Sequence, residues 1–220
     1  MNGSRGARVS THPTEAQTTY RMSHFDFIEI GVCDFDTLIG NPAAKNGLSV
    51  EPVSAYFKKF PERPGVQTLR AAVSDYDGVG FMYYIPPETL LARKLPSWLR
   101  GCNALNKTHQ TVKNKIAKGK LEADLVIKEP CRVLSVPTLI TTYNIKTVDY
   151  LKIDTEGHDC IILNQFIEIW RSCALMEKPK HIRFETNALT TLRERKYTIA
   201  ALESLGYTIH RNAENTDAYL

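Results

Sequence analysis

The stretch 148-VDYLKIDTEGHDCIIL-163 decides the fold, because in it a strand pattern passes directly into a helix pattern. Residues 148–154 form a short apolar run typical of a buried strand, and residues 158–172 carry apolar positions at helical spacing. Asp154 and Glu156 lie where the two patterns meet. Acidic side chains are rarely buried without a partner, so these two either stabilise the start of the helix or face a ligand.

The same alternation of short strands and helices runs along the chain. It predicts one α/β domain whose mostly parallel sheet is covered by helices on both faces. Ligands of such sheets bind at the carboxyl ends of the strands. Strands are expected at 25–31, 47–52, 66–73, 79–85, 148–154, 181–186 and 206–211, and helices at 53–61, 136–145, 158–172 and 189–205.

Composition sets the limits of this domain. Residues 1–23 are polar and hold no apolar signal-peptide segment, which predicts a disordered tail before a single domain at 24–220. An organelle transit peptide is the alternative, because the tail has several arginines and one acid, Glu15. No run approaches the roughly 20 apolar residues of a membrane span. The five scattered cysteines lack a C-x-x-C pair, which favours reduced thiols and a cytoplasmic location.

Residues 86–132 interrupt the alternation and predict a basic, helical insertion. Between residues 93 and 120 the chain has no acid, so this segment is expected to attract anions. Its lysines either form a solvated helix face or contact phosphates or a sugar acid on a substrate. The cations are Arg93, Lys94, Arg100, Lys107, Lys113, Lys115, Lys118 and Lys120.

Four predicted strands end in acids, at Glu29, Glu51, Asp154 and Glu185. In a parallel sheet these groups converge on one edge, where they would repel a pyrophosphate. The first turn, residues 31–37, has one glycine and two aspartates and is a poor phosphate cradle. A cation that carries sugar hydroxyls suits such an edge, and S-adenosylmethionine has a sulfonium, an ammonium and a ribose diol.

Local explanations compete with this interpretation. Asp34, Asp36 or Thr37 is a suitable N-cap for a helix after the first turn. Glu156 and His158 are suited to the first turn of the helix at 158–172, where the helix dipole favours an acid. Asp154 at the end of an apolar strand is harder to explain locally, so we predict a functional role for it.

Several of these segments resemble the FkbM-type methyltransferases, a branch of the class I S-adenosylmethionine-dependent enzymes. The most specific match is 150-YLKIDTEGHDCIIL-163, and together the matches span residues 25 to about 210. The resemblance implies a Rossmann-like three-layer sandwich with a final antiparallel strand and a helical insertion. The supporting matches are 27-FIEIG-31, 48-LSVEP-52, 71-AAVSDYDG-78 and 205-LGYTI-209.

The resemblance also implies roles for single residues. Glu29 and Gly31 would hold the methionine portion of the cofactor, with Asp34 a further cofactor-binding candidate in the same turn. Asp154 would lie beside the methyl group and the acceptor. One position departs from the family, because Phe35 stands where a second glycine is usual, and a bulky side chain there is expected to reshape or weaken the pocket. Glu51 would bind the ribose, and Ala72 and Val73 would border the adenine.

The predicted activity is O-methylation of a hydroxyl on a small molecule or sugar. An alcohol acceptor needs a general base, and the candidates are His158, Asp154 and, from the insertion, His109. His158 is preferred because it directly follows the matched loop. A divalent metal held by Asp154, Glu185 and Asn187 would also activate a hydroxyl, although we expect a metal-free site.

Two other functions remain open from the sequence. The basic insertion, with Trp98, Tyr83 and Tyr84 near it, suits an RNA methyltransferase, although the chain lacks an aromatic RNA-binding strand motif. Phe35 in the first turn suits a binding module that has kept the fold and lost the activity. The identity of the acceptor and the oligomeric state are not encoded in any motif of this chain.

Overall fold

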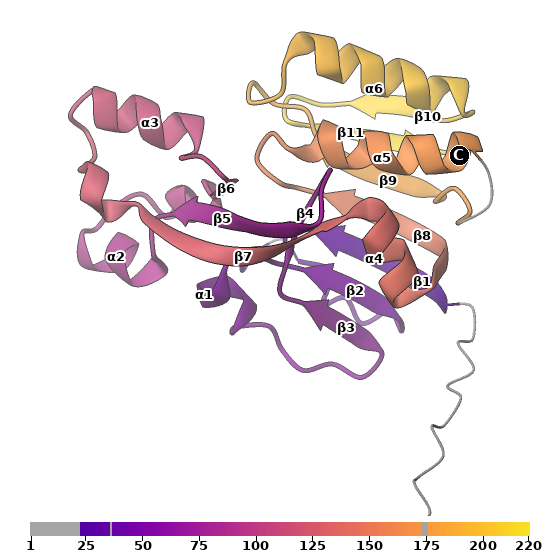
Figure 1. The fold of residues 1–220 in the computed structure, drawn as a ribbon, viewed down its shortest axis with the longest axis horizontal. Coiled ribbons are helices and arrows are strands. Elements are labelled where there is room, and N and C mark those ends of the chain that lie inside the picture. Colours follow the sequence, from indigo (N-terminus) through magenta and orange to yellow (C-terminus); the bar gives the residue numbers. More distant parts are fainter. Residues whose placement is uncertain (1–22, 36, 173–175) are drawn as a thin grey trace, which may run out of the picture.

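The computed structural model describes residues 23–35, 37–172 and 176–220, and it is a mixed α/β structure with two sheets (Figure 1). The larger sheet has seven strands in the order β10-β11-β9-β8-β1-β2-β3. Its strands are β1 (Ser23–Ile30), β2 (Gly47–Val50), β3 (Val66–Leu69), β8 (Ile145–Ile153), β9 (His181–Glu185), β10 (Thr208–Arg211) and β11 (Asn215–Tyr219).

The first five of these strands in chain order run parallel, as the strand pattern predicts. β11 lies antiparallel to both β9 and β10, so the predicted antiparallel end of the sheet is present. It consists of two strands instead of the one expected at 206–211. The chain reverses in a tight turn in which Asn212 accepts hydrogen bonds from the backbone N–H groups of Glu214 and Asn215.

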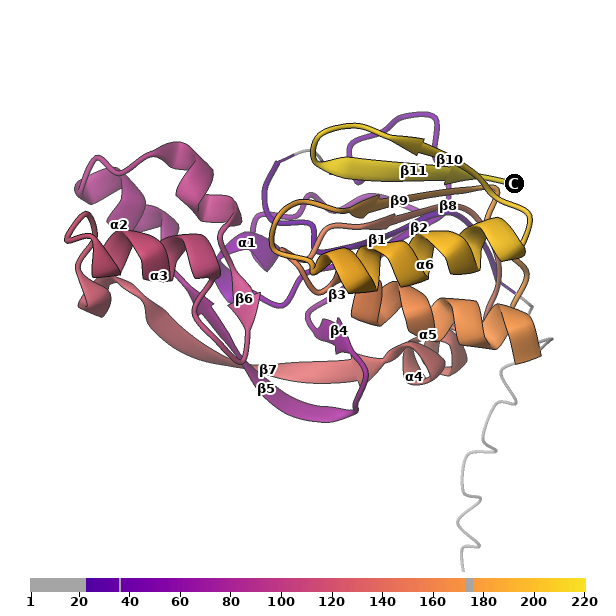
Figure 2. The same cartoon turned by 90° about the horizontal axis from the view of Figure 1, so that it is seen from above.

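Helices α4 (Val136–Tyr143), α5 (Asp159–Ser172) and α6 (Leu192–Ser204) lie on one face of the large sheet (Figure 2). They bury the apolar side chains of that face, among them Ile28, Leu151 and Phe184. The structure does not show three complete layers. On the opposite face of the large sheet the loop after β1 packs against β1, and the described residues of this loop contain no helix. Leu38 of this loop donates its backbone N–H to Glu29 of β1.

Two predicted elements of the first half are wrong in extent. The expected strand at 66–73 is two strands, because the chain passes from β3 to β4 of the other sheet at Arg70, whose side chain pairs with Glu129. The expected helix at 53–61 is the single turn α1 (Ser54–Phe57), and Pro61 prevents its extension by removing a backbone donor.

The smaller sheet has the order β4-β7-β5-β6 and carries the insertion. A strand, β7, occupies the last residues of the segment 86–132 predicted as the insertion, and it pairs with β5 from Ile127 to Val133. Pro130 and the flanking charges hide this strand from a sequence pattern. The strands of the smaller sheet are β4 (Ala72–Ser74), β5 (Gly78–Tyr84), β6 (Ala104–Leu105) and β7 (Ile127–Ser135). The helices of the insertion are α2 (Pro87–Ala92), α3 (Gln110–Ala117) and the short 3₁₀ helices η1 (Ser97–Gly101) and η2 (Ala123–Leu125).

The insertion projects from the body of the domain and has a small core of its own (Figure 1).

Among the described residues, every helix is too short or too polar to cross a bilayer. Four cysteines are buried free thiols, and Cys173 lies outside the described residues, as does the predicted tail up to residue 22. These thiols are Cys33, Cys102, Cys131 and Cys160.

Candidate active site

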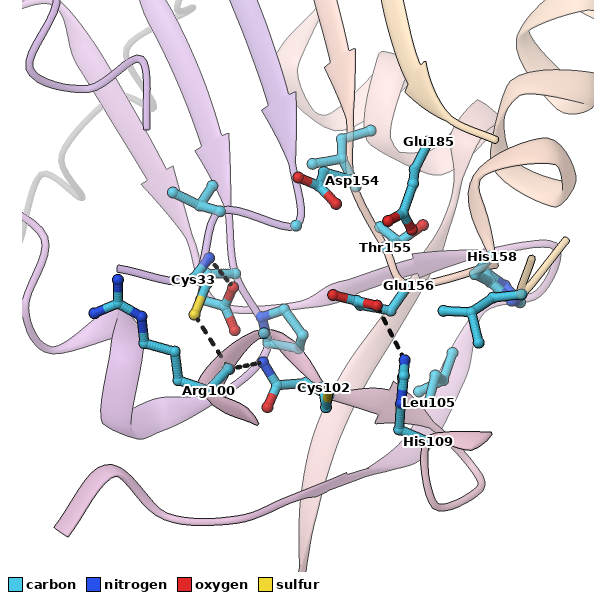
Figure 3. A pocket seen from close by; sticks show the side chains of 18 of the residues that line it. Cys33, Arg100, Cys102, Leu105, His109, Asp154, Thr155, Glu156, His158 and Glu185 are labelled. Carbon is cyan, nitrogen blue, oxygen red and sulfur yellow. Dashed lines mark hydrogen bonds and ion pairs between the residues drawn. The ribbon is translucent and has the colours of Figure 1, made fainter. Parts of the chain in front are cut away.

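A cavity of about 780 Å³ opens at the carboxyl ends of β1, β2, β8 and β9. The loops after these strands form one wall, and the insertion forms the other (Figure 3). This is the edge at which the parallel-sheet pattern places a ligand. Of the predicted site residues, those that line the cavity are Gly31, Glu51, Ala72, Val73, His109, Asp154 and His158.

The first turn is tied closely to the end of β8. Gly31 has φ +82°, and a Cβ placed on it would lie 1.9 Å from the carbonyl oxygen of Asp154. The backbone N–H of Asp154 in turn donates to Ile30 at 2.9 Å. Only glycine fits here, because both the left-handed backbone and the close approach of another carbonyl exclude a side chain.

Glu51 is 3% exposed and closes the same turn from the end of β2. One carboxylate oxygen accepts the backbone N–H of Cys33 at 2.7 Å, and the other accepts that of Val53 at 2.7 Å. Burial raises the pKa of Glu51 to about 7. The two oxygens together offer about four lone-pair sites, so the carboxylate remains able to accept a hydroxyl group of a ligand.

Three acids meet on the sheet side of the cavity. Carboxylate oxygens of Asp154, Glu156 and Glu185 lie within 4.8 Å of one another and point into the same space (Figure 3). Burial and the neighbouring Glu156 raise the pKa of Glu185 to about 9. Its Oε2 is buried and has no hydrogen-bond partner among the described residues. This oxygen of Glu185 is therefore left for a group that the described residues do not supply.

Asp159 holds two sides of this cluster together, although the sequence did not single it out. It is fully buried, and one oxygen accepts the backbone N–H of Glu185 at 3.0 Å. The other accepts the hydroxyl of Thr155 at 2.9 Å and its backbone N–H at 3.3 Å. Burial and the charge of Asp154 raise the pKa of Asp159 to about 7. The available signal was an acid in the first turn of a helix, which is too common to indicate this role.

The two candidate histidines differ in what their rings can do. Nδ1 of His109 accepts the backbone N–H of Thr111 at 3.2 Å and caps α3, while Nε2 lies 3.0 Å from Glu156. Because Nδ1 accepts, Nε2 carries the proton and donates it to the carboxylate. His109 therefore joins the insertion to the acidic loop and has no free lone pair. Nε2 of His158 lies 2.9 Å from the Ser74 hydroxyl, and its other ring nitrogen has no hydrogen-bond partner among the described residues.

Glu29 and Asp34 do not line the cavity. Glu29 is fully buried behind it, where its carboxylate lies 3.3 Å from Nζ of Lys152 and accepts the Thr37 hydroxyl at 2.9 Å. Asp34 pairs with Lys59 at 2.7 Å. Neither it nor Thr37 caps a helix, because the described residues between β1 and β2 contain none, and Asp36 lies outside them.

Phe35 lines the cavity from the first turn and packs against the insertion. The guanidinium of Arg100 lies 4.5 Å from the centre of its ring. Asn187, proposed as a metal ligand, instead donates its amide to Glu185 and accepts the backbone N–H of Leu189. Both residues thus shape the walls of the cavity.

The family model of the methyltransferase FkbM domain matches residues 29–209. The chain belongs to the FkbM methyltransferase family. The match covers β2, β3, β8 and β9 of the large sheet, the insertion and every residue that lines the cavity up to Leu189. No curated protein and no solved structure matches the chain. The resemblance seen in 150-YLKIDTEGHDCIIL-163 is therefore confirmed, and the cavity is the candidate active site of this FkbM domain.

Proposed function

We propose that this FkbM protein transfers the methyl group of S-adenosylmethionine to a hydroxyl of an acceptor that binds between the sheet and the insertion. The observation that carries this proposal is the convergence of the Asp154, Glu156 and Glu185 carboxylates at the strand ends, where the buried Oε2 of Glu185 has no hydrogen-bond partner among the described residues. The sulfonium and ammonium groups of the donor supply positive charge at this point.

The rest of the cavity suits the other parts of this donor. Glu51 accepts the ribose hydroxyls with the lone pairs that the backbone leaves free. Ala72, Val73 and Met82 are buried apolar residues on the lining and border the adenine. The methionine portion lies along the turn at Gly31, where the absence of a side chain leaves room for it.

The acceptor hydroxyl attacks the methyl carbon opposite to sulfur. An O–C bond forms, the S–C bond breaks with its electron pair moving to sulfur, and the hydroxyl proton passes to His158. Desolvation lowers the pKa of His158, so its ring is neutral and able to accept this proton at neutral pH. The protein's main contribution is to hold donor and acceptor in line.

A divalent cation is the other positive charge that fits the three carboxylates, since hard oxygen ligands suit magnesium or manganese. It would lower the pKa of the acceptor hydroxyl.

Calorimetric titration with S-adenosylmethionine in the presence of EDTA, which removes any divalent cation, tests the main proposal. Saturable binding at micromolar to millimolar donor supports it, whereas the absence of binding at millimolar donor contradicts it.

Glu51→Gln is expected to weaken S-adenosylmethionine binding by roughly 10-fold to 100-fold, the range for a lost charge-assisted hydrogen bond. The turnover number at saturating donor should change much less, because Glu51 lies away from the methyl group. Calorimetry and steady-state kinetics measure the two effects. Since Glu51 also binds the first turn, the thermal midpoint of the free variant is recorded. An unchanged dissociation constant in a folded variant contradicts the ribose role.

Donor binding is expected to release protons. In the free protein Glu185, whose pKa is raised to about 9, holds a proton at neutral pH. A sulfonium beside it favours the carboxylate, so its pKa falls on binding and affinity rises with pH up to about 9. Calorimetry in buffers of different ionisation enthalpy counts the protons released. Glu185→Gln should abolish this pH dependence, and its persistence in that variant would assign the proton to another group.

A further inference from the structure

The two walls of the cavity carry opposite charge. The sheet side holds the acidic cluster, whereas the insertion side places Arg100 on the lining and Lys115 against Trp98 at the rim. Lys107 precedes His109, which lines the cavity, by two residues. Arg100 pairs with Asp34 at 3.7 Å, whereas a cationic donor gives no role to Trp98 and Lys115. The second substrate is therefore expected to be an anion.

The basic wall also exposes a flat aromatic surface. Trp98 lines the cavity and is 48% exposed, and Nζ of Lys115 lies 5.0 Å from the centre of its ring. The other tryptophan of the chain, Trp170, is buried in the core. A large exposed indole beside lysines is suited to stacking on a planar ring that carries negative charge, as a nucleotide base with its phosphate does.

Further cations lead away from the opening along the insertion. The N-terminus of α3 faces the cavity through His109, and the helix extends outward for about 12 Å. Within the described residues these lysines form no ion pair with an acid, so their charge is available to a ligand. They are Lys113, Lys115, Lys118 and Lys120.

Resting on the proposed function, we propose that the acceptor is a ribonucleotide within a single strand of RNA. Its base stacks on Trp98, and a ribose hydroxyl faces the donor. The neighbouring phosphates contact Lys107, Lys113, Lys115, Lys118 and Lys120. The ribose hydroxyl attacks the methyl carbon, the S–C bond electrons go to sulfur, and the proton goes to His158. A free nucleotide has the same base, ribose and phosphate but reaches only the opening of the cavity. Contact with the outer lysines requires a longer strand.

Quenching of tryptophan fluorescence tests this directly, because Trp98 is exposed and Trp170 is not. The protein is first saturated with S-adenosylhomocysteine, so that the donor site is filled, and then titrated with uridine, uridine 5′-monophosphate or a ten-residue polyuridylate. We expect quenching in the order polyuridylate, monophosphate, uridine. For three neutralised phosphates, affinity should fall about 20-fold between about 50 and 200 mM salt.

Three variants identify the surface. Trp98→Leu is expected to lose the quenching and to bind polyuridylate about 10-fold more weakly. The triple variant Lys113→Gln, Lys115→Gln, Lys118→Gln should flatten the salt dependence. Lys196→Gln, an exposed lysine of α6 that does not line the cavity, is the matched control and should behave as the wild type.

Methyl incorporation completes the test. Labelled methyl from the donor should enter polyuridylate and should not enter the same strand with every 2′-hydroxyl already methylated. Salt-independent binding, or no binding, by a protein that does bind S-adenosylhomocysteine overturns the RNA proposal and leaves the donor proposal intact. Binding of anionic vesicles with no polyuridylate binding overturns it as well. Failure to bind S-adenosylhomocysteine at all overturns the proposed function itself.

Discussion

Asp154→Asn is expected to lower the rate of methyl transfer about 100-fold or more while the protein stays folded. The substitution keeps the shape of the side chain and removes its charge from the acidic cluster. In the proposed mode of binding Asp154, at the end of β8, lies beside the methyl group, and its carboxylate lies within 4.8 Å of those of Glu156 and Glu185. A charge at this point stabilises the donor in the geometry of transfer, so its loss acts mainly on turnover.

The control for Asp154→Asn is binding of the uncharged product. S-adenosylhomocysteine has no sulfonium, so its affinity should change less than that of S-adenosylmethionine. Thermal unfolding shows whether the loop 154–157 is intact, since Asp159 still holds it through Thr155. Full turnover in a folded Asp154→Asn variant would remove this residue from the mechanism.

Gly31→Ala is expected to destabilise the protein by about 3 kcal/mol or more, with loss of donor binding. Its Cβ would lie 1.9 Å from the Asp154 carbonyl oxygen, and its backbone has φ +82°. Neither the main chain of β8 nor that of the first turn moves without breaking the hydrogen bond from Asp154 to Ile30. The chain must therefore open the junction of the two central strands, which also forms the floor of the cavity.

Two other glycines separate the causes of this effect. A Cβ on Gly40, in the same loop, meets nothing within 4 Å, so Gly40→Ala should be close to neutral. Gly119 has φ +64° and equally open surroundings, so Gly119→Ala should cost about 1 kcal/mol through backbone strain alone. Chemical denaturation of the three variants gives the comparison. A Gly31→Ala protein as stable as Gly40→Ala would show that the junction is not rigid.

Much of the fold followed from local periodicity. The strand at 148–154, the helix after it and the parallel strands before it are visible because each buries its own apolar side chains, a property of a few consecutive residues. The elements that were mispredicted depend on distant partners. The chain leaves the large sheet after Leu69 and joins the smaller sheet as β4, and β7 is a strand because β5 pairs with it from Ile127 to Val133.

The candidate site divides in the same way. The sequence by itself placed Glu51, Asp154 and Glu185 at strand ends, and with them the edge where the cavity opens, because parallel strands bring their carboxyl ends together. Only the tertiary structure decided that Glu29 turns to Lys152, that His109 is bound to Glu156, and that Asp159 joins two loops. The direction of a side chain and the partner it meets depend on contacts between segments far apart in the chain, and no local pattern contains them.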